Sequence, residues 1–283
     1  MEGKQIALCG SGHGAAAAFR SLADKFDTLC VVSDDTEIVK MMRPNDRRVK
    51  ALSDFNDFVI VCAGFTNRVC EEILSRNTVV NTHPSLLPKY RGMHSLVWAI
   101  LNDDPTIGFS IHLMNNEMDD GDILAQYETP NNEKTSAEIW SEFDRYVQEN
   151  LSSVISRFLD GSLQPVKQDL AKATWVPKRN LKDCEMVWTE TNSRLSALMR
   201  ALVPPYPYPL IRTPKNLYSV LEADVLERSY YCTVGRVVGH HGGTEFNKSA
   251  VGMVRLSNLY HAETEKPVSV NEALPLGLRL PIG

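Results

Sequence analysis

Residues 5–14 read QIALCGSGHG, a short apolar run that ends in three glycines at alternate positions. A continuous apolar run bounded by glycine is typical of a strand that is buried on both faces of a sheet. The residues that follow, 14–22, contain four consecutive alanines and favour a helix. A buried strand joined through a glycine turn to a helix predicts the first β-α unit of a parallel sheet.

The same alternation of short apolar runs and helical patterns continues through the first part of the chain. The fold class that it predicts is α/β: a Rossmann-like, mostly parallel sheet with helices on both faces. The predicted strands are residues 5–9, 29–32, 58–62, 79–81, 107–114 and 123–127, and the predicted helices are residues 14–22, 36–42, 67–74, 95–101 and 136–159.

The alternation stops after residue 159, and residues 164–180 are polar and irregular, as in a linker. A helix is predicted to begin at Thr191 or Asn192, and the proline-rich run 203–209 that follows it cannot be helical. We predict two domains: a catalytic domain with its linker at 1–180, and a small β-rich, OB-like barrel domain at 181–283. The predicted strands of the second domain are residues 218–226, 231–238 and 250–256.

The charge of the chain bears on its partners. The 283 residues contain 30 Lys and Arg against 35 Asp and Glu, for a formal net charge of −5. Residues 181–283 alone contain 11 Lys and Arg and 10 Asp and Glu, for a net charge of +1. Proteins that grip nucleic acid through its phosphates carry a basic face, so a near-neutral second domain argues against a nucleic-acid partner.

The six cysteines lie far apart and form no C-x-x-C pair. We interpret them as buried free thiols in a reducing cytoplasm rather than as disulfides or a metal site. The apolar run before Gly10 is too short for a signal peptide or a membrane span. We therefore expect a cytoplasmic protein with no metal and no membrane segment.

The glycine turn at residues 10–14 is compatible with a dinucleotide phosphate, with Asp34 or Asp35 on a ribose. The last glycine of the full dinucleotide fingerprint is missing, and a tight strand-to-helix turn explains the pattern equally simply. We favour the tight turn. Because ligands of open α/β sheets gather at the carboxyl ends of the strands, Ser11 and His13 remain candidates for substrate contact.

Residues 81–92, NTHPSLLPKYRG, follow a predicted strand end. Alternate residues of a strand share a face, so Asn81 and His83 are expected to converge. An amide that donates to a developing oxyanion and an imidazole that moves a proton suit acyl chemistry. A histidine buried in the core is the alternative, and the stiff segment that holds Pro84 and Pro88 weighs against it.

A second polar cluster, MDDGD, covers residues 118–122. Three carboxylates within four residues usually form a solvated loop. One of them is alternatively directed back toward the imidazole to stabilise its charged form. Sequence distance alone does not choose between these two interpretations.

Taken together, these segments resemble the signature of the folate-dependent formyltransferases. That family includes methionyl-tRNA formyltransferase, glycinamide ribonucleotide transformylase and the sugar N-formyltransferases. The resemblance covers most of the first domain and continues into the linker and the second domain. The matching segments are residues 81–88, 91–92, 108–112 and 118–124, followed by 173–179, 200–202, 205–207 and 235–280.

The resemblance implies a catalytic set of Asn81, His83 and Asp119. Asp119 aligns rather than Asp120, because the family pattern is an apolar residue, Asp, one variable residue and Gly. The implied formyl donor is 10-formyltetrahydrofolate, and neither a metal nor a covalent enzyme intermediate is required. The implied folate contacts are Phe65, Thr66, Asn67, Ser85, Leu86, Leu87, Pro88, Asp120, Gly121 and Asp122.

The acceptor is inferred by comparing relatives. The loop at residues 34–50 is short and mixes acids with bases, and residues 92–98 resemble the sugar N-formyltransferases. We therefore predict a nucleotide-linked amino sugar, first a dTDP-linked 3-amino- or 4-amino-dideoxyhexose, made for bacterial surface polysaccharide such as lipopolysaccharide O-antigen. The purine-pathway enzymes normally lack a second domain. Two alternatives stay open: a methionyl-tRNA formyltransferase, and a catalytically inactive formyltransferase fold that only binds.

Two groups of residues are predicted to contact this acceptor. Arg91 is a candidate for the diphosphate, with a structural salt bridge as the alternative. Tyr206 and Tyr208 are candidates for stacking on the base, with a rigid interdomain clasp as the alternative. Related enzymes often form dimers, so a homodimer is possible here. The full predicted set is Ser11, His13, Lys89, Tyr90, Arg91, Tyr206 and Tyr208.

Overall fold

The computed structural model describes residues 4–226, 231–241, 244–249 and 251–282. The chain divides into two compact units. The first consists of residues 1–96, 106–130 and 138–178, and the second of residues 97–105, 131–137 and 179–283. The second unit thus includes two segments from the first half of the chain, which no local pattern indicated, and the two predicted domain ranges stay a prediction.

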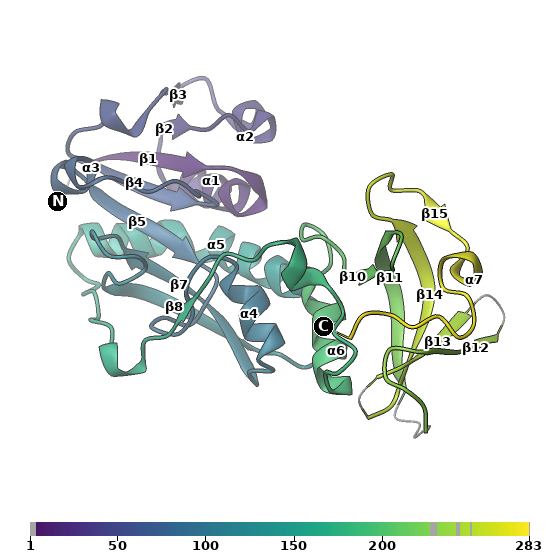
Figure 1. Ribbon diagram of the computed structural model, residues 1–283. Coiled ribbons are helices and arrows are strands. Elements are labelled where there is room, and N and C mark those ends of the chain that lie inside the picture. Colours follow the sequence, from purple (N-terminus) through teal and green to yellow (C-terminus); the bar gives the residue numbers. More distant parts are fainter. Residues whose placement is uncertain (1–3, 227–230, 242–243, 250, 283) are drawn as a thin grey trace. The chain divides into compact units, whose positions relative to one another are not determined.

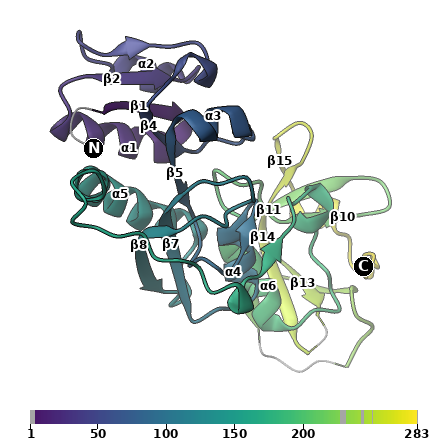
Figure 2. The ribbon, with the colours of Figure 1, turned by 90° about the vertical axis from the view of Figure 1, so that its left-hand side faces the viewer.

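A seven-stranded sheet with the order β3-β2-β1-β4-β5-β7-β8 forms the centre of the described first unit (Figures 1 and 2). The strands from β3 to β5 in this order pair in parallel, whereas β7 is antiparallel to both β5 and β8. The predicted mostly parallel α/β sheet is therefore confirmed. The strands are β1 (Gln5–Gly10), β2 (Leu29–Val32), β3 (Arg47–Arg48), β4 (Phe58–Ala63), β5 (Thr78–His83), β7 (Thr106–Leu113) and β8 (Ile123–Pro130).

Small side chains bring the first helix close to this sheet. The helices that follow the strands are α1 (Gly12–Lys25), α2 (Thr36–Met41), α3 (Glu71–Arg76), α4 (Ser95–Leu101) and α5 (Ser136–Leu159), with short 3₁₀ turns η1 (Leu52–Asp54) and η2 (Leu170–Lys172). In α1, Ala15 and Ala18 are completely buried. A Cβ atom on Gly10 would lie 1.7 Å from the carbonyl oxygen of Ala63, so only glycine allows β1 and β4 to end side by side.

Three predictions for this unit differ from the structure. The helix expected at residues 67–74 begins only at Glu71, because residues 64–70 form the loop after β4. The strand expected at 79–81 continues to His83, because β7 pairs with it as far as Ser110. Residues 164–178 belong to the first unit rather than to a free linker: β9 (Trp175–Val176) pairs in parallel with β6 (Arg91–Gly92).

The second unit contains a six-stranded sheet in its described residues, with the order β10-β11-β14-β13-β12 and β15 paired to β14. A small β-rich domain is therefore confirmed, while its closure into a barrel stays a prediction. Thr191 caps α6, since its hydroxyl accepts a hydrogen bond from the Arg194 amide. The elements are η3 (Leu181–Cys184), α6 (Asn192–Ala201), β10 (Leu210–Arg212), β11 (Leu217–Leu226), β12 (Val237–His241), β13 (Thr244–Lys248), β14 (Met253–His261), β15 (Pro267–Val268) and α7 (Val270–Ala273).

Of the strand predicted at residues 231–238, only the last two residues are in a strand, because β12 begins at Val237 after a turn in which the Arg236 amide donates to the Thr233 carbonyl. Of the strand predicted at 250–256, Ala250 lies outside the described residues and β14 begins at Met253. Among the described residues, no helix is both long and apolar enough to cross a membrane.

Candidate active site

Strand β5 carries Asn81 and His83 to the carboxyl edge of the sheet. The register with β7 places Asn81 opposite His112 and His83 opposite Ser110. Across this antiparallel pair, Nδ2 of Asn81 lies 3.2 Å from Nε2 of His112. The imidazole of His112 therefore lies next to the amide of Asn81, in addition to the imidazole of His83 that the sequence predicted.

His83 is 5% exposed and is oriented by a backbone carbonyl. Its Nε2 lies 2.9 Å from the carbonyl oxygen of Tyr90, which can only accept, so Nε2 carries a proton and donates it there. In the neutral imidazole, Nδ1 then holds a lone pair, and it lies 3.6 Å from Oδ2 of Asp119. Asp119 is therefore within ion-pair range of His83, while the Tyr90 carbonyl fixes the ring.

Asp119 lies between the two imidazoles. Its carboxylate accepts a hydrogen bond of 2.8 Å from the Gly92 amide, and its other oxygen lies 3.7 Å from Nε2 of His112. Its backbone has a φ of 52°, a left-handed conformation that is uncommon outside glycine. Such strained residues concentrate at functional sites, so this loop is held in shape by its surroundings.

His112 is 1% exposed and is neutral at physiological pH. Burial, and next the neighbouring His83, lower its pKa from 6.5 to about 4. Its Nδ1 lies 2.7 Å from the Leu113 carbonyl oxygen and donates to it, so Nε2 is left as an acceptor for the Asn81 amide. This contact fixes which end of the Asn81 side chain is nitrogen, and it leaves the second N–H of Nδ2 for another acceptor.

Arg91 and Gln168 hold the Asp119 loop in place through hydrogen bonds and an ion pair. Arg91 is 3% exposed; its side chain forms a 2.7 Å ion pair with Asp120 and donates to Oε1 of Gln168 at 2.7 Å. Nε2 of Gln168 donates to the carbonyls of Asp119 and Gly121 at 2.8 and 2.7 Å. This geometry favours the structural salt bridge as the role of Arg91, and its contact with a diphosphate stays a prediction.

The segment Ser85–Pro88, predicted to contact folate, is held rigidly. The Ser85 hydroxyl donates to the Lys89 carbonyl at 2.7 Å, and the Leu87 amide donates to the Ser110 hydroxyl at 3.1 Å. Ser85 and Leu87 are buried, whereas Leu86 and Pro88 are partly exposed. The backbone of this segment is therefore preorganised beside the Asn81 and His83 side chains.

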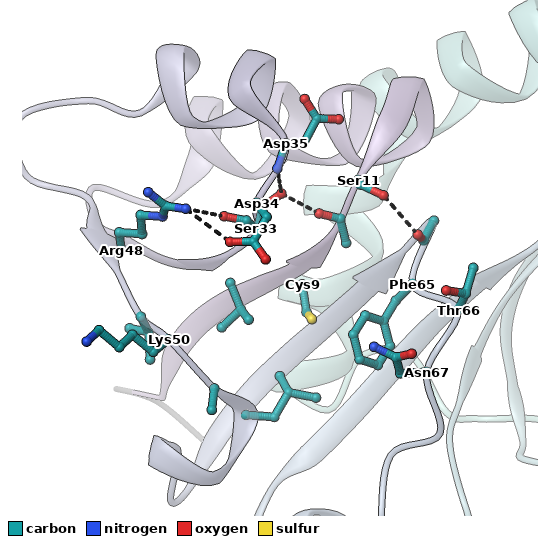
Figure 3. Close-up of a pocket in the computed structure, with 16 residues that line it drawn as sticks. Cys9, Ser11, Ser33, Asp34, Asp35, Arg48, Lys50, Phe65, Thr66 and Asn67 are labelled. Atoms are coloured by element: carbon teal, nitrogen blue, oxygen red, sulfur yellow. Dashed lines mark hydrogen bonds and ion pairs between the residues drawn. The ribbon is translucent and has the colours of Figure 1, made fainter.

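The other predicted ligand contacts lie in five places. Phe65, Thr66 and Asn67 line a cavity of about 930 Å³ together with Ser11 (Figure 3). Nδ1 of His13 donates to Oδ2 of Asp144 at 2.7 Å, and this hydrogen bond raises the pKa of His13 against the opposing effect of burial. The remaining candidates are Asp122 in the Asp119 loop, Lys89 and Tyr90 in the loop before β6, and Tyr206 and Tyr208, which belong to the second unit and are placed only within it.

Sequence reasoning assigned no role to His112 or Gln168. His112 carries one signal, a single histidine in a mostly apolar strand, and the antiparallel partner of that strand is the strand of Asn81. Gln168 carries none, because it lies in a segment that was interpreted as a linker. Among the described residues, no group of three or more His, Cys, Asp and Glu side chains is arranged to hold a metal ion.

Asn81 and His83 lie at the end of β5, and Asp119 reaches them from the loop between β7 and β8; an amide, an imidazole and a carboxylate in this arrangement suit the transfer of acyl-type groups. The comparison with known families agrees: residues 15–155, about half of the chain, match the formyl transferase family. The chain belongs to this family.

Individual relatives add detail. The chain is 31% identical over 174 residues to the methionyl-tRNA formyltransferase of Caldanaerobacter subterraneus subsp. tengcongensis, covering 59% of this chain and 56% of that protein. The match thus spans less than two thirds of that relative's length. An N-formyltransferase from Helicobacter canadensis, solved with folinic acid and dTDP-3-aminofucose, has a TM-score of 0.72 at 16% identity and covers 91% of this chain and 100% of its own.

HypX from Aquifex aeolicus, solved with tetrahydrofolic acid, has a TM-score of 0.69 at 16% identity. The similarity covers 96% of this chain and 47% of HypX. At this level of identity the two solved structures establish a shared fold.

Proposed function

We propose that this protein transfers a formyl group from 10-formyltetrahydrofolate to the primary amine of a nucleotide-linked aminodeoxy sugar. The observation that carries formyl transfer is the convergence of Asn81, His83 and Asp119, with Nδ1 of His83 3.6 Å from the Asp119 carboxylate. Membership of the formyl transferase family supports the same chemistry.

In this proposal a neutral acceptor amine attacks the formyl carbon, and the formyl oxygen becomes an oxyanion. The N–H of Asn81 that is not donated to His112 stabilises that oxygen. Nδ1 of His83 takes the proton that the amine loses, because Nε2 is committed to the Tyr90 carbonyl. The Asp119 carboxylate stabilises the imidazolium, which returns its proton to the departing folate nitrogen when the old C–N bond breaks.

The proposed folate site follows the loop after β4 and the segment Ser85–Pro88. Thr66 and Asn67 are exposed, and hydrogen bonds within the fold fix the backbone of Ser85–Pro88, so its shape does not need to reorganise when a flat ring binds. These features fit a pterin ring, whose edge carries both hydrogen-bond donors and acceptors. Neither contact requires a metal ion.

Two observations support the sugar acceptor over a tRNA. Residues 181–283 have a net charge of only +1, which gives little electrostatic attraction to a phosphate backbone. The structural similarity to the Helicobacter canadensis N-formyltransferase covers 91% of this chain with a TM-score of 0.72, whereas the structural similarity to the methionyl-tRNA formyltransferase from Clostridium thermocellum covers 78% with a TM-score of 0.61. The sequence match to the Caldanaerobacter enzyme, at 31% identity, keeps a methionyl-tRNA formyltransferase as the second candidate.

The catalytic roles are tested with His83→Ala and His83→Gln. Loss of a general acid-base group is expected to lower kcat by about 10²–10⁴-fold in both variants. His261→Ala, which changes a histidine of the second unit on β14, is the matched control and is expected to retain full activity. Activity of the His83 variants within twofold of the wild type would contradict the proposed mechanism and would favour a fold that only binds.

The acceptor is tested by incubating the protein and 10-formyltetrahydrofolate with a panel of dTDP-, UDP- and GDP-linked amino sugars, and separately with charged initiator tRNA. Mass spectrometry then detects the added formyl group. We expect formylation of at least one nucleotide amino sugar. A formylated product found only with the tRNA would replace the proposal with the second candidate.

A further inference from the structure

Thr174, the residue directly before β9, makes three hydrogen bonds to the segment that follows His83. Its hydroxyl oxygen accepts from the Tyr90 amide at 2.9 Å, and its carbonyl oxygen accepts from the Arg91 amide at 2.8 Å. Its own amide donates to the Pro88 carbonyl at 3.2 Å. Two of these bonds use the main chain, so any residue except proline can make both of them. The bond to the Tyr90 amide needs a side chain with an oxygen at this position.

The Tyr90 residue that receives this bond is strained. Its φ is 57°, in the left-handed region, where a large side chain crowds the backbone. A residue keeps such a conformation only when its surroundings hold it there. The contacts that hold it include the Thr174 hydroxyl on its amide and Nε2 of His83, which donates to its carbonyl at 2.9 Å. A return of φ to the ordinary negative range would move that carbonyl away from the imidazole.

The Tyr90 carbonyl decides which nitrogen of a neutral His83 carries the proton. The imidazole has an acceptor on each side: the Tyr90 carbonyl lies 2.9 Å from Nε2, and Oδ2 of Asp119 lies 3.6 Å from Nδ1. The first distance is that of a hydrogen bond, and the second is too long for one. Oδ2 of Asp119 already accepts from the Gly92 amide at 2.8 Å. The proton therefore lies on Nε2, and Nδ1 keeps the lone pair that the proposed mechanism uses as its base.

Displacement of the Tyr90 carbonyl would reverse this choice. The Asp119 carboxylate would then be the strongest acceptor beside the ring, because hydrogen bonds to a charged oxygen are stronger than those to a neutral one. The single proton of the neutral imidazole would move to Nδ1, and that nitrogen could no longer take a proton from an amine. A catalytic imidazole in the wrong tautomer can lose about 10⁴-fold in kcat.

We propose that Thr174 is a positioning residue: its hydroxyl holds Tyr90 so that the Tyr90 carbonyl accepts from Nε2 of His83 and leaves Nδ1 free to act as the base. The inference rests on the proposed function, in which Nδ1 accepts the proton of the amine. Thr174 is exposed, so its side chain can be changed without opening a cavity in the core.

The first test determines the tautomer of His83 in two variants. Thr174→Val keeps the shape of the side chain and removes the hydroxyl, whereas Thr174→Ser keeps the oxygen. Nitrogen-15 NMR of histidine-labelled protein at about pH 8.5, above the ordinary pKa of histidine, distinguishes protonated from unprotonated ring nitrogens. The signals of His83 are identified by their absence in His83→Gln. We expect the proton on Nε2 in the wild type and in Thr174→Ser, and on Nδ1 in about half or more of Thr174→Val molecules.

The second test measures formylation of the nucleotide amino sugar that the acceptor panel identifies. We expect kcat of Thr174→Val to fall by about ten- to a hundredfold while KM for the formyl donor stays within about threefold, and kcat of Thr174→Ser to stay within about threefold of the wild type. Thr106→Val, at the exposed first residue of β7, is the matched control and is expected to change neither the tautomer nor kcat. Thr174→Ala removes the hydroxyl in a second way and is expected to behave as Thr174→Val does.

An unchanged His83 tautomer in folded Thr174→Val or Thr174→Ala would overturn the inference, as would equal losses of kcat in Thr174→Val and Thr174→Ser. The NMR measurement needs neither donor nor acceptor, so it separates this inference from the proposed function. A shifted tautomer in a protein that formylates no acceptor upholds the role of Thr174 in orienting His83 and removes the proposed function. Full activity of Thr174→Val with the wild-type tautomer removes the role of Thr174 and leaves the proposed function.

Discussion

Replacing His112 with a side chain that does not titrate is expected to make the protein less sensitive to acid. The folded state holds His112 neutral, with its pKa lowered to about 4 by burial and by the nearby His83, whereas the unfolded chain returns it to 6.5. Between these values the unfolded state binds a proton that the folded state does not. Stability is therefore lost as the pH falls from about 6.5 to about 4, and this group adds no further change below that.

The magnitude follows from the two pKa values. A pKa difference of one corresponds to about 1.4 kcal/mol, so His112 accounts for a total loss of about 3 kcal/mol, of which about 2 kcal/mol falls between pH 7 and pH 5. Its side chain is only 1% exposed, so solvent screening does not reduce this figure appreciably. His112→Gln is the suitable variant, because its amide oxygen can replace Nε2 as the acceptor for Asn81.

The assay is urea unfolding followed by tryptophan fluorescence, with wild type and His112→Gln at pH 7 and pH 5. The wild type is expected to lose about 2 kcal/mol more than the variant between the two pH values. His112→Asn places an amide near Nδ1 instead, keeps the contact with Leu113, and leaves Asn81 without its acceptor. We expect kcat to fall about tenfold or more in His112→Asn and to change by less than about threefold in His112→Gln. Parallel pH dependence of wild type and variant, or an imidazole of His112 that titrates near 6.5 by NMR, would refute the reasoning.

Two other predictions concern the Asp119 loop. Gln168→Leu leaves the carbonyls of Asp119 and Gly121 without their donor. We therefore expect the free energy of unfolding to fall by about 2 kcal/mol, and kcat to fall as well. An unchanged urea midpoint together with an unchanged kcat would contradict the role of Gln168 in supporting this loop. Asp119→Asn removes the charge beside His83. We therefore expect kcat to fall by about 100-fold or more, while KM for the formyl donor stays within a few-fold of the wild-type value. A raised KM with an unchanged kcat would instead indicate a role of Asp119 in binding.

The sequence predicted the elements whose signals are local. Each central strand contains a short run of apolar residues that is buried on both faces, and such runs are typical of strands in an α/β sheet. Asn81 and His83 were predictable for the same reason, since alternate residues of one strand must share a face. The sequence did not decide whether the acidic loop at residues 118–122 points toward His83 or toward solvent. Asp119 lies 36 residues from His83 in the chain, and only the pairing of β7 with β8 brings its carboxylate near the imidazole.

The features that escaped prediction depend on contacts between distant segments. The pKa of His112 is lowered because its side chain is buried between β5 and the Asp119 loop. The residues around position 112 do not predict that burial. The helix expected at residues 67–74 has a suitable pattern, but the loop after β4 takes its first four residues, and α3 begins only at Glu71. Propensity is a weak guide where a loop must cross the edge of a sheet.

Arg91 shows why residue type alone does not assign a role. Its guanidinium could match a diphosphate or form a structural salt bridge, and the residue type does not choose between these two roles. In the structure, the same planar group joins Asp120 to Gln168 and lies 5.5 Å from the ring centre of Trp175. A buried guanidinium needs several partners at once. Arg91 therefore contacts both the loop of Asp120 and the segment that holds Gln168 and Trp175. The loop that carries Asp119 is thus held by residues from 168 to 175, and the segment that looks like a linker is part of the candidate active site.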